Sequence, residues 1–390
     1  MLIRDASYEQ AVTAWTAHLR AGGTTDWSAW RANATDELGE ALHPLPDAIH
    51  LELLRRINLA ASEGGDVRGL ADRVLATAAP GRGLLDVPLP WPTAPRRFGT
   101  PPMDPVDLPE EELIRLAVGV LAHLLPGVPH STREALPAPW PFPWRRRFCL
   151  HGSPGTVAGV RKNLLAQGLV ETDWRPTYIV IARPVSVMMA EWWAASVRDG
   201  GILKWSTAWR RAEAAGRLPP STDVSGIADR LTARDRSRGM DRVHVVVATK
   251  AEEAAALTAG ILGARPGEIQ ESGDAAVSDL LRRLNRLTAV THGPGRVRGL
   301  ARVLAATLDE AATPAHPVTT LAPPPPSLGW ARERAASTAR AIRDAGYAVH
   351  GELDALTPTD HRLPGTVDRG RTLELAVMAC LRSWHLRGNS

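Results

Sequence analysis

The stretch from residue 147 to residue 183 constrains the fold of this chain more than any other. It opens with a short apolar run, Phe148-Cys149-Leu150, that leads into the small residues of HGSPGT at 151–156. Apolar residues then recur at helical spacing over 157–167. A β-branched apolar run of strand length follows at 178–182. The order strand, turn, helix, strand predicts a βαβ unit, and such a unit requires a parallel sheet.

Residues 151–156 form the predicted turn between the first strand and its helix. Small residues there let several backbone N–H groups converge on one point, where the helix dipole also favours an anion. The pattern therefore indicates a phosphate-binding turn. Small residues also serve tight strand-to-helix turns for steric reasons alone, so a purely structural role stays open.

Composition is that of a globular protein large enough for more than one domain. The chain has 390 residues, of which 44% are hydrophobic and 23% are charged. The net charge is only +4, and no basic run is longer than Arg145–Arg147. Aromatic residues do not alternate with basic ones, as binding of single-stranded nucleic acid would require. The sequence therefore predicts no nucleic-acid partner.

Two cysteines, Cys149 and Cys380, are too few for a disulfide framework, and no His, Cys or carboxylate cluster has zinc-ligand spacing. We therefore expect no metal site. The N-terminus is polar from its fourth residue, which predicts no signal peptide. The longest apolar segment, residues 113–125, is too short to span a bilayer. These features predict a cytoplasmic protein without a membrane span.

Repeated proline marks a linker at 127–145, because proline can neither continue a helix nor donate to a strand ladder. We therefore expect a helical domain at 1–126 and an α/β domain at 146–390 with a mostly parallel sheet. The strands are expected at 148–150, 178–182, 243–247 and 347–350. The helices are expected at 8–20, 51–61, 69–77, 110–125, 157–167, 187–198, 223–231, 251–262, 275–287, 298–306, 330–345 and 373–386.

An internal repeat links the two predicted domains. WTAHLRAGGTTDWSAWR at 15–31 recurs as WAASVRDGGILKWSTAWR at 193–210. Two further pairs follow in the same order. They are LLRRIN at 53–58 with LLRRLN at 280–285, and RGLADRVLAT at 68–77 with RGLARVLAAT at 298–307. The repeat predicts a partial duplication whose first copy kept helices but not strands. Its tryptophans pack a helix–GlyGly–helix corner or build a ligand site.

The chain resembles sulfotransferase-like P-loop proteins of actinobacteria over residues 147–386. The resemblance rests on the strand that enters Gly-Ser-Pro-Gly-Thr at 152–156 and on Ile-Val-Ile-Ala-Arg-Pro at 179–184. A Trp-Trp helix and the Gly200-Gly201 bend follow in the family's order. The resemblance implies a P-loop sulfotransferase fold and the sulfate donor 3′-phosphoadenosine-5′-phosphosulfate (PAPS).

The resemblance also implies roles for single residues. The donor phosphates would be held by Gly152, Ser153, Gly155, Thr156, Arg183 and Ser186. His151 would act as the base toward an acceptor hydroxyl.

The chain departs from the family pattern at two of these places. The lysine of the family's turn is missing, so Lys162, about 9 Å along the helix axis from Thr156, is the candidate for the missing charge. The serine expected eight residues after Arg183 is replaced by Glu191, whose carboxylate would repel a phosphate.

Two hypotheses follow. In the first, the chain is an enzyme that transfers a sulfuryl group from PAPS to a hydroxyl of a small metabolite or glycan. In the second, it is a pseudoenzyme that uses the fold to bind or scaffold a protein partner or another copy of itself. An open anion-accepting turn at 152–156 would favour the first hypothesis, and a turn filled by side chains would favour the second.

Overall fold

The structure is a computed structural model. It describes residues 6–33, 47–61, 67–84, 87–91, 100–127, 146–234, 243–269, 274–311, 321–358 and 364–388. The expected proline-rich linker, 127–145, lies outside the described residues from 128 onward.

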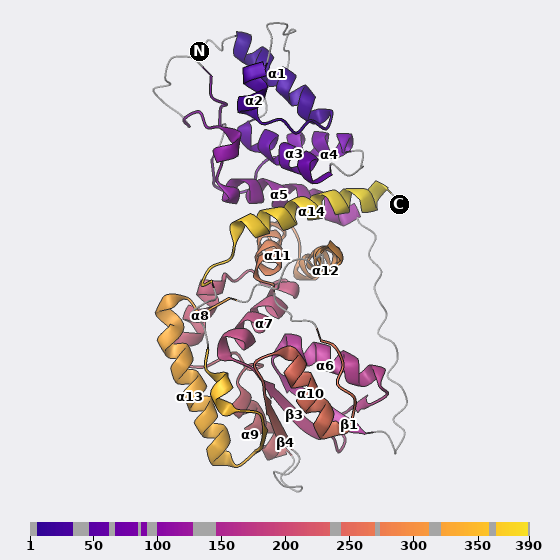
Figure 1. Ribbon diagram of the computed structural model, residues 1–390, viewed down its shortest axis with the longest axis vertical. Coiled ribbons are helices and arrows are strands. Elements are labelled where there is room, and N and C mark those ends of the chain that lie inside the picture. The colour runs from indigo at the N-terminus through magenta and orange to yellow at the C-terminus, as the bar shows by residue number, and fades with distance from the viewer. Residues whose placement is uncertain are drawn as a thin grey trace. The chain divides into compact units, whose positions relative to one another are not determined.

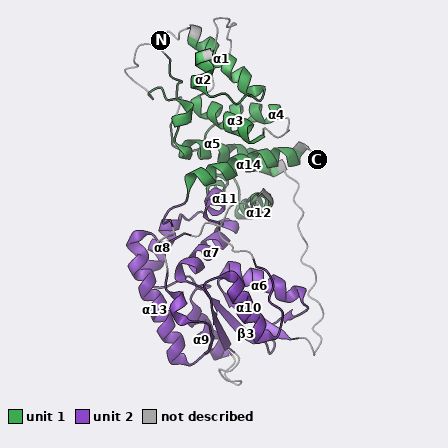
Figure 2. Cartoon of the chain, viewed as in Figure 1, with its two compact units in different colours: residues 1–131, 283–314, 368–390 green, residues 132–282, 315–367 purple. Residues whose placement is uncertain are grey.

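The chain divides into two compact units, each assembled from separate segments (Figure 2). Unit 1 comprises Met1–Ser131, Arg283–Pro314 and Asp368–Ser390, and unit 2 comprises Thr132–Arg282 and Ala315–Val367. The sequence-based division differs from this, because it assigned 283–314 and 368–390 to the sheet domain. These segments group with the N-terminal helices because the helix Arg369–Gly388 packs against the helices Ala48–Ala61 and Glu110–Leu124, and the helix Pro294–Ala311 packs against it in turn.

Unit 1 is helical, and its centre is the pair α5 (Glu110–Leu124) and α14 (Arg369–Gly388), which pack along each other. Small residues, Ala117 on α5 with Ala376 and Ala379 on α14, are fully buried. Small side chains let two helices approach closely. The other elements of unit 1 are α1 (Ala6–Arg20), α2 (Trp27–Asn33), α3 (Ala48–Ala61), α4 (Arg68–Ala76), η1 (Pro105–Asp107), η2 (Leu125–Gly127) and α12 (Pro294–Ala311).

Unit 2 contains a five-stranded, all-parallel sheet (Figure 1). Its order is β2-β1-β3-β4-β5. The expected α/β class, the parallel sheet and the four expected strands are confirmed. The fifth, β2, was missed because two residues are too few to show a pattern. The strands are β1 (Arg147–Gly152), β2 (Val170–Glu171), β3 (Thr177–Ala182), β4 (Val243–Val247) and β5 (Ala348–His350).

Helices cover both faces of the sheet. Alternate strand residues such as Leu150, Ile179 and Val246 pack against α6 (Pro154–Ala166) and α10 (Ala251–Leu262) in one apolar core. The opposite face, which carries Cys149 and His151, is covered by α9 (Val224–Arg234). The remaining elements are α7 (Val185–Arg198), α8 (Trp205–Ala214), η4 (Pro325–Ser327), α13 (Leu328–Ala345), η5 (Leu353–Leu356) and α11 (Ala275–Thr288), which crosses the boundary between the units.

The α1–α2 corner is held by two buried tryptophans. The indole N–H of Trp15 donates to the carbonyl of Thr25 at 3.1 Å, and that of Trp27 donates to the carbonyl of Pro90 at 3.2 Å. The two rings lie 5.2 Å apart with an interplanar angle of 56°. Gly22 turns the chain between the helices with φ of +92°, a conformation that favours glycine.

The α7–α8 corner repeats this geometry. Trp193 donates to the carbonyl of Leu203 at 2.7 Å, and Trp205 donates to that of Ala322 at 3.0 Å. The rings lie 5.6 Å apart, again at 56°, and Gly200 also has φ of +92°. All four tryptophans are at most 5% exposed. In both corners the tryptophans are therefore packing residues, and the second of each pair also donates to a carbonyl outside the corner.

Candidate functional site

The turn between β1 and α6 is tighter than the sequence predicted. β1 runs to Gly152 and α6 starts at Pro154, three residues before the expected start, so only Ser153 lies between them. Proline fits the first position of a helix because its missing N–H has no partner to lose there. Gly152 has φ of +111°, and a Cβ there would collide with the carbonyl oxygen of Ile181. Only glycine fits at that position.

The sheet order places a topological switch point at this turn. From β1 the chain moves to β2 on one side and then crosses to β3 on the other side. Ligands of open α/β sheets bind outside the carboxyl ends of the strands at such a point. Ser153 and Thr156 follow β1, and Arg183 follows β3, so the structure brings these three predicted residues together. We call them, with the turn's backbone, the cradle.

The carboxylate of Glu191, on α7, fills the cradle. Its Oε2 accepts hydrogen bonds from the Ser153 hydroxyl at 2.6 Å and from the Thr156 N–H at 2.9 Å. Its Oε1 accepts from the Thr156 hydroxyl at 2.7 Å and from Arg183 Nη1 at 3.0 Å. Backbone N–H, hydroxyls and guanidinium are the groups that would hold a phosphate. They are engaged by a carboxylate of the chain itself.

This ion pair is sealed from solvent. The side chains of Arg183 and Glu191 are 3% and 0% exposed. Arg183 also donates from Nη2 to the carbonyl of Thr249 at 2.8 Å. The desolvation cost of a buried ion pair is offset only when further hydrogen bonds satisfy its members, and Glu191 accepts three besides that from Arg183.

The other residues predicted for donor binding have different surroundings. The backbone N–H of Ser153, expected to face a phosphate, donates to the carbonyl of Ile181 at 3.1 Å. Gly155 lies half-buried in the first turn of α6, and Ser186 is buried in the first turn of α7. Lys162, expected to supply charge, is exposed on α6.

His151, the predicted base, lies on the α9 face of β1 beside Cys149. Its Nε2 is 3.3 Å from Cys149 Sγ, which is 3.7 Å from Asp173 Oδ1. Burial, reinforced by the charges of Asp173 and Glu171, raises the pKa of the Cys149 thiol to about 11. Burial also lowers the pKa of His151. At neutral pH the thiol is therefore protonated and the imidazole neutral, so this cysteine is a poor nucleophile.

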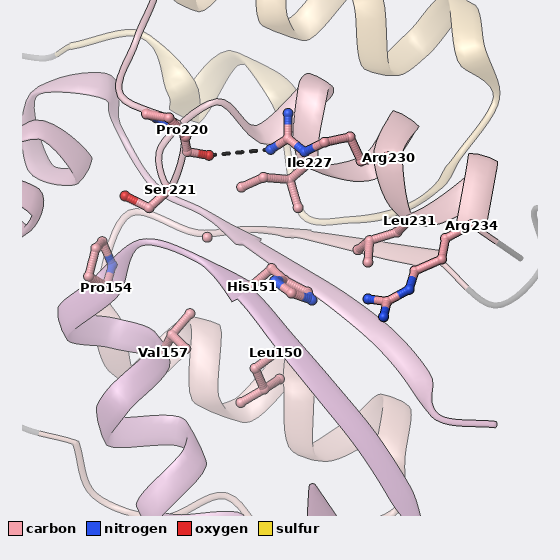
Figure 3. A pocket seen from close by; sticks show the side chains of 11 residues that line it. Leu150, His151, Pro154, Val157, Pro220, Ser221, Ile227, Arg230, Leu231 and Arg234 are labelled. Atoms are coloured by element: carbon pink, nitrogen blue, oxygen red, sulfur yellow. Dashed lines mark hydrogen bonds between the residues drawn. The ribbon is translucent and has the colours of Figure 1, made fainter. Parts of the chain in front are cut away.

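A pocket of about 610 Å³ opens beside the cradle, and His151 lies in its wall (Figure 3). Two arginines of α9, Arg230 and Arg234, line this pocket and were not predicted from the sequence. The four-residue spacing of these arginines was visible in the sequence, but the sheet face that α9 covers was not. The lining residues are Leu150, His151, Gly152, Pro154, Val157, Pro220, Ser221, Ile227, Arg230, Leu231 and Arg234.

Among the residues that the structure describes, no group of three or more His, Cys, Asp and Glu side chains is placed to hold a metal ion. Within the same ranges, none of the helices combines the length and apolar character that a membrane span needs.

Comparison of the chain with protein-family models, curated proteins and solved structures finds no match.

Proposed function

We propose that this chain is a sulfotransferase-like protein that does not bind a sulfate donor and serves as a binding or scaffolding module. One observation carries the proposal. The Glu191 carboxylate occupies the position at the cradle where the family resemblance would place a donor phosphate. A turn filled by a side chain is the arrangement that favours the second of the two hypotheses.

Charge supports the same conclusion. A donor phosphate at the cradle would have to displace Glu191 or lie against its negative charge. Displacement would take the Glu191 carboxylate away from its four hydrogen bonds, and a buried charge that loses its partners costs about 3–5 kcal/mol. The residues present therefore do not fit PAPS.

The rival proposal is sulfuryl transfer from PAPS to a hydroxyl of a small metabolite or glycan. It needs a positive charge at the moving group, and loss of one such group costs on the order of a thousandfold in rate. The chain has Gly155 where the family's turn has lysine, and Lys162 is exposed on α6. The rival proposal therefore lacks both a free donor site and a placed charge.

The partial duplication predicted from the sequence also supports a binding or scaffolding role. We infer that the two tryptophan corners derive from one helical ancestor, and that the copy with α7 belongs to the P-loop sulfotransferase type. The support is the set of matched hydrogen bonds, ring distances and glycine conformations in the two corners. A copy kept without a sheet suits a scaffold more than an enzyme.

Calorimetric titration of the full chain with 3′-phosphoadenosine-5′-phosphate, the inert donor product, tests the proposal. We expect no binding up to millimolar ligand. Glu191→Ser, which restores the hydroxyl that the family has at this place, is expected to gain binding. Micromolar binding by the unaltered chain that Arg183→Ala abolishes would reverse the conclusion and support the enzyme.

A further inference from the structure

The pocket beside the cradle has the size and position of a small-molecule site. Its volume of about 610 Å³ is within the range of roughly 300–1,000 Å³ typical of such sites. It opens at the carboxyl end of β1, next to the switch point between β1 and β3. Unlike the cradle, it is not filled by a side chain of the protein.

The pocket carries positive charge on one side. Arg230 and Arg234 are four residues apart on α9 and therefore lie on the same side of that helix. Arg230 Nη2 reaches the neutral carbonyl of Pro220 at 3.5 Å, a long hydrogen bond drawn in Figure 3. Arg234 lies 4.0 Å from Asp173, and both of these side chains are more than two-thirds exposed. Neither contact is strong enough to hold its guanidinium away from a ligand.

Most of the other lining residues are apolar. Ile227 and Leu231 of α9 lie on the His151 side of β1, and Leu150 and Val157 lie on its other side (Figure 3). The lowered pKa of His151 leaves it neutral at pH 7, able to form a hydrogen bond without adding charge. None of the described residues that line the pocket is acidic.

We propose that this pocket binds an organic oxyanion, a carboxylate or a phosphate monoester, attached to an apolar or aromatic body. Arg230 and Arg234 hold the oxyanion, because a guanidinium fork matches the geometry of both groups. Ile227 and Leu231 hold the body, and His151 hydrogen-bonds at the junction. The inference rests on the binding role proposed above and gives it a ligand class.

The test is calorimetric titration of the full chain with four probes that separate the contribution of the negative charge from that of the aromatic ring. The probes are benzoate, phenyl phosphate, the neutral benzyl alcohol and inorganic phosphate. We expect at least one of the two aromatic anions to bind in the micromolar to millimolar range. Benzyl alcohol and inorganic phosphate are each expected to bind at least about tenfold more weakly. Benzyl alcohol lacks the oxyanion, and inorganic phosphate lacks the aromatic body.

Two variants assign the binding to this pocket. Arg230→Gln and Arg234→Gln are each expected to weaken the bound aromatic anion about tenfold. Arg340→Gln, at an exposed arginine of α13 in the same unit, is the matched control and should change nothing. All three positions are at the surface, so the variants should fold.

Several results would overturn the inference. They are no binding of either aromatic anion at millimolar concentration, equal binding of benzyl alcohol, equal binding of inorganic phosphate, and unchanged affinity in both pocket variants. The titration with 3′-phosphoadenosine-5′-phosphate remains a separate readout of the cradle. Donor binding there would contradict the proposed function, whereas failure of the aromatic anions would contradict only the pocket's ligand class.

Discussion

The α1–α2 and α7–α8 corners have the same internal geometry but differ in what their first helices carry. Two residues before the first tryptophan stand Thr13 on α1 and Glu191 on α7. Thr13 is exposed and donates to the carbonyl of Glu9 in its own helix at 2.8 Å. Glu191 is buried and fills the cradle. The corner is thus a packing unit that tolerates either role, and a single polar residue on α7 decides whether the cradle is filled.

The largest predicted difference between the corners is the loss of stability when Glu191 or its counterpart Thr13 is replaced by alanine. Glu191→Ala should lower the free energy of unfolding of unit 2 by about 3–5 kcal/mol, because it leaves the buried Arg183 without its counter-charge. Thr13→Ala should change stability by less than about 0.5 kcal/mol, because the site is exposed. Urea denaturation of both variants measures the two effects.

A double variant separates lost charge pairing from lost packing. Glu191→Leu combined with Arg183→Met removes both charges and should recover only part of the loss. No unpaired charge then stays buried, but the Ser153 hydroxyl and the Thr156 N–H still lose their acceptor. If Glu191→Ala lowered the free energy of unfolding no more than Thr13→Ala does, the ion pair in the cradle would not stabilise the fold.

Substitution of the tryptophans should have equal effects in the two corners. Trp15→Phe and Trp193→Phe each remove an indole N–H and leave a carbonyl, that of Thr25 or Leu203, without this donor. Each should cost about 1–3 kcal/mol. Denaturation followed by fluorescence and by circular dichroism gives the two values. A difference of more than about twofold would show that the corners are not equivalent packing units.

The glycines that turn the two corners should also respond alike, to a smaller degree. Gly22→Ala and Gly200→Ala each place a Cβ on a residue with φ of +92°. The expected cost is about 1–2 kcal/mol from backbone strain, and space is not limiting at Gly22, where a Cβ would meet no atom within 4 Å. Thermal denaturation measures both variants, and no loss in either would contradict the left-handed turn.

A smaller effect, dependent on pH, should distinguish the two copies. Aligning LLRRIN with LLRRLN pairs Asp47 with Asp274, and both accept hydrogen bonds at the start of their helices. His50 of the first copy pairs with Val277 of the second. His50 lies 2.8 Å from Asp47 and 2.7 Å from the carbonyl of Thr77, so both ring nitrogens face acceptors.

Burial opposes the charge on His50, but the Asp47 carboxylate and the two hydrogen bonds outweigh it and raise the pKa of His50. Likewise, burial opposes the charge on Asp47, and contacts with His50 outweigh it and lower the Asp47 pKa.

The raised pKa of His50 makes its stabilising effect complete below about pH 6.5 and causes its loss as pH rises through the folded-state value. The lowered pKa of Asp47 makes its contribution present above about pH 4 and lost below. Unit 1 should therefore lose about 0.5–1 kcal/mol as pH rises from 6 to 9. His50→Val, which copies the second helix, should abolish this slope in thermal denaturation. A slope unchanged in that variant would assign it to other groups.

The limits of sequence-based prediction differ between the sheet and the site. β3 and β4 were predictable because a β-branched apolar run bounded by turns has few other folds. The meeting of Ser153 with Arg183 was also predictable, because carboxyl ends of adjacent parallel strands share an edge. The place of Glu191 at this site followed only from the family resemblance, because the helical pattern does not show where α7 begins or how deeply it packs. The pocket could not be predicted because the position of Arg230 over β1 follows from tertiary packing and not from the local sequence.

Anion rescue of a cradle variant tests the central claim most directly. Glu191→Ser opens the cradle while keeping the hydroxyls and Arg183, so inorganic sulfate should bind there and stabilise the fold. Sulfate also stabilises proteins generally, so the unaltered chain and Thr13→Ser are measured at the same sulfate concentration. We predict a rise in melting temperature for Glu191→Ser clearly larger than in the two controls. Equal rises in all three proteins would contradict the claim that Glu191 occupies an anion site.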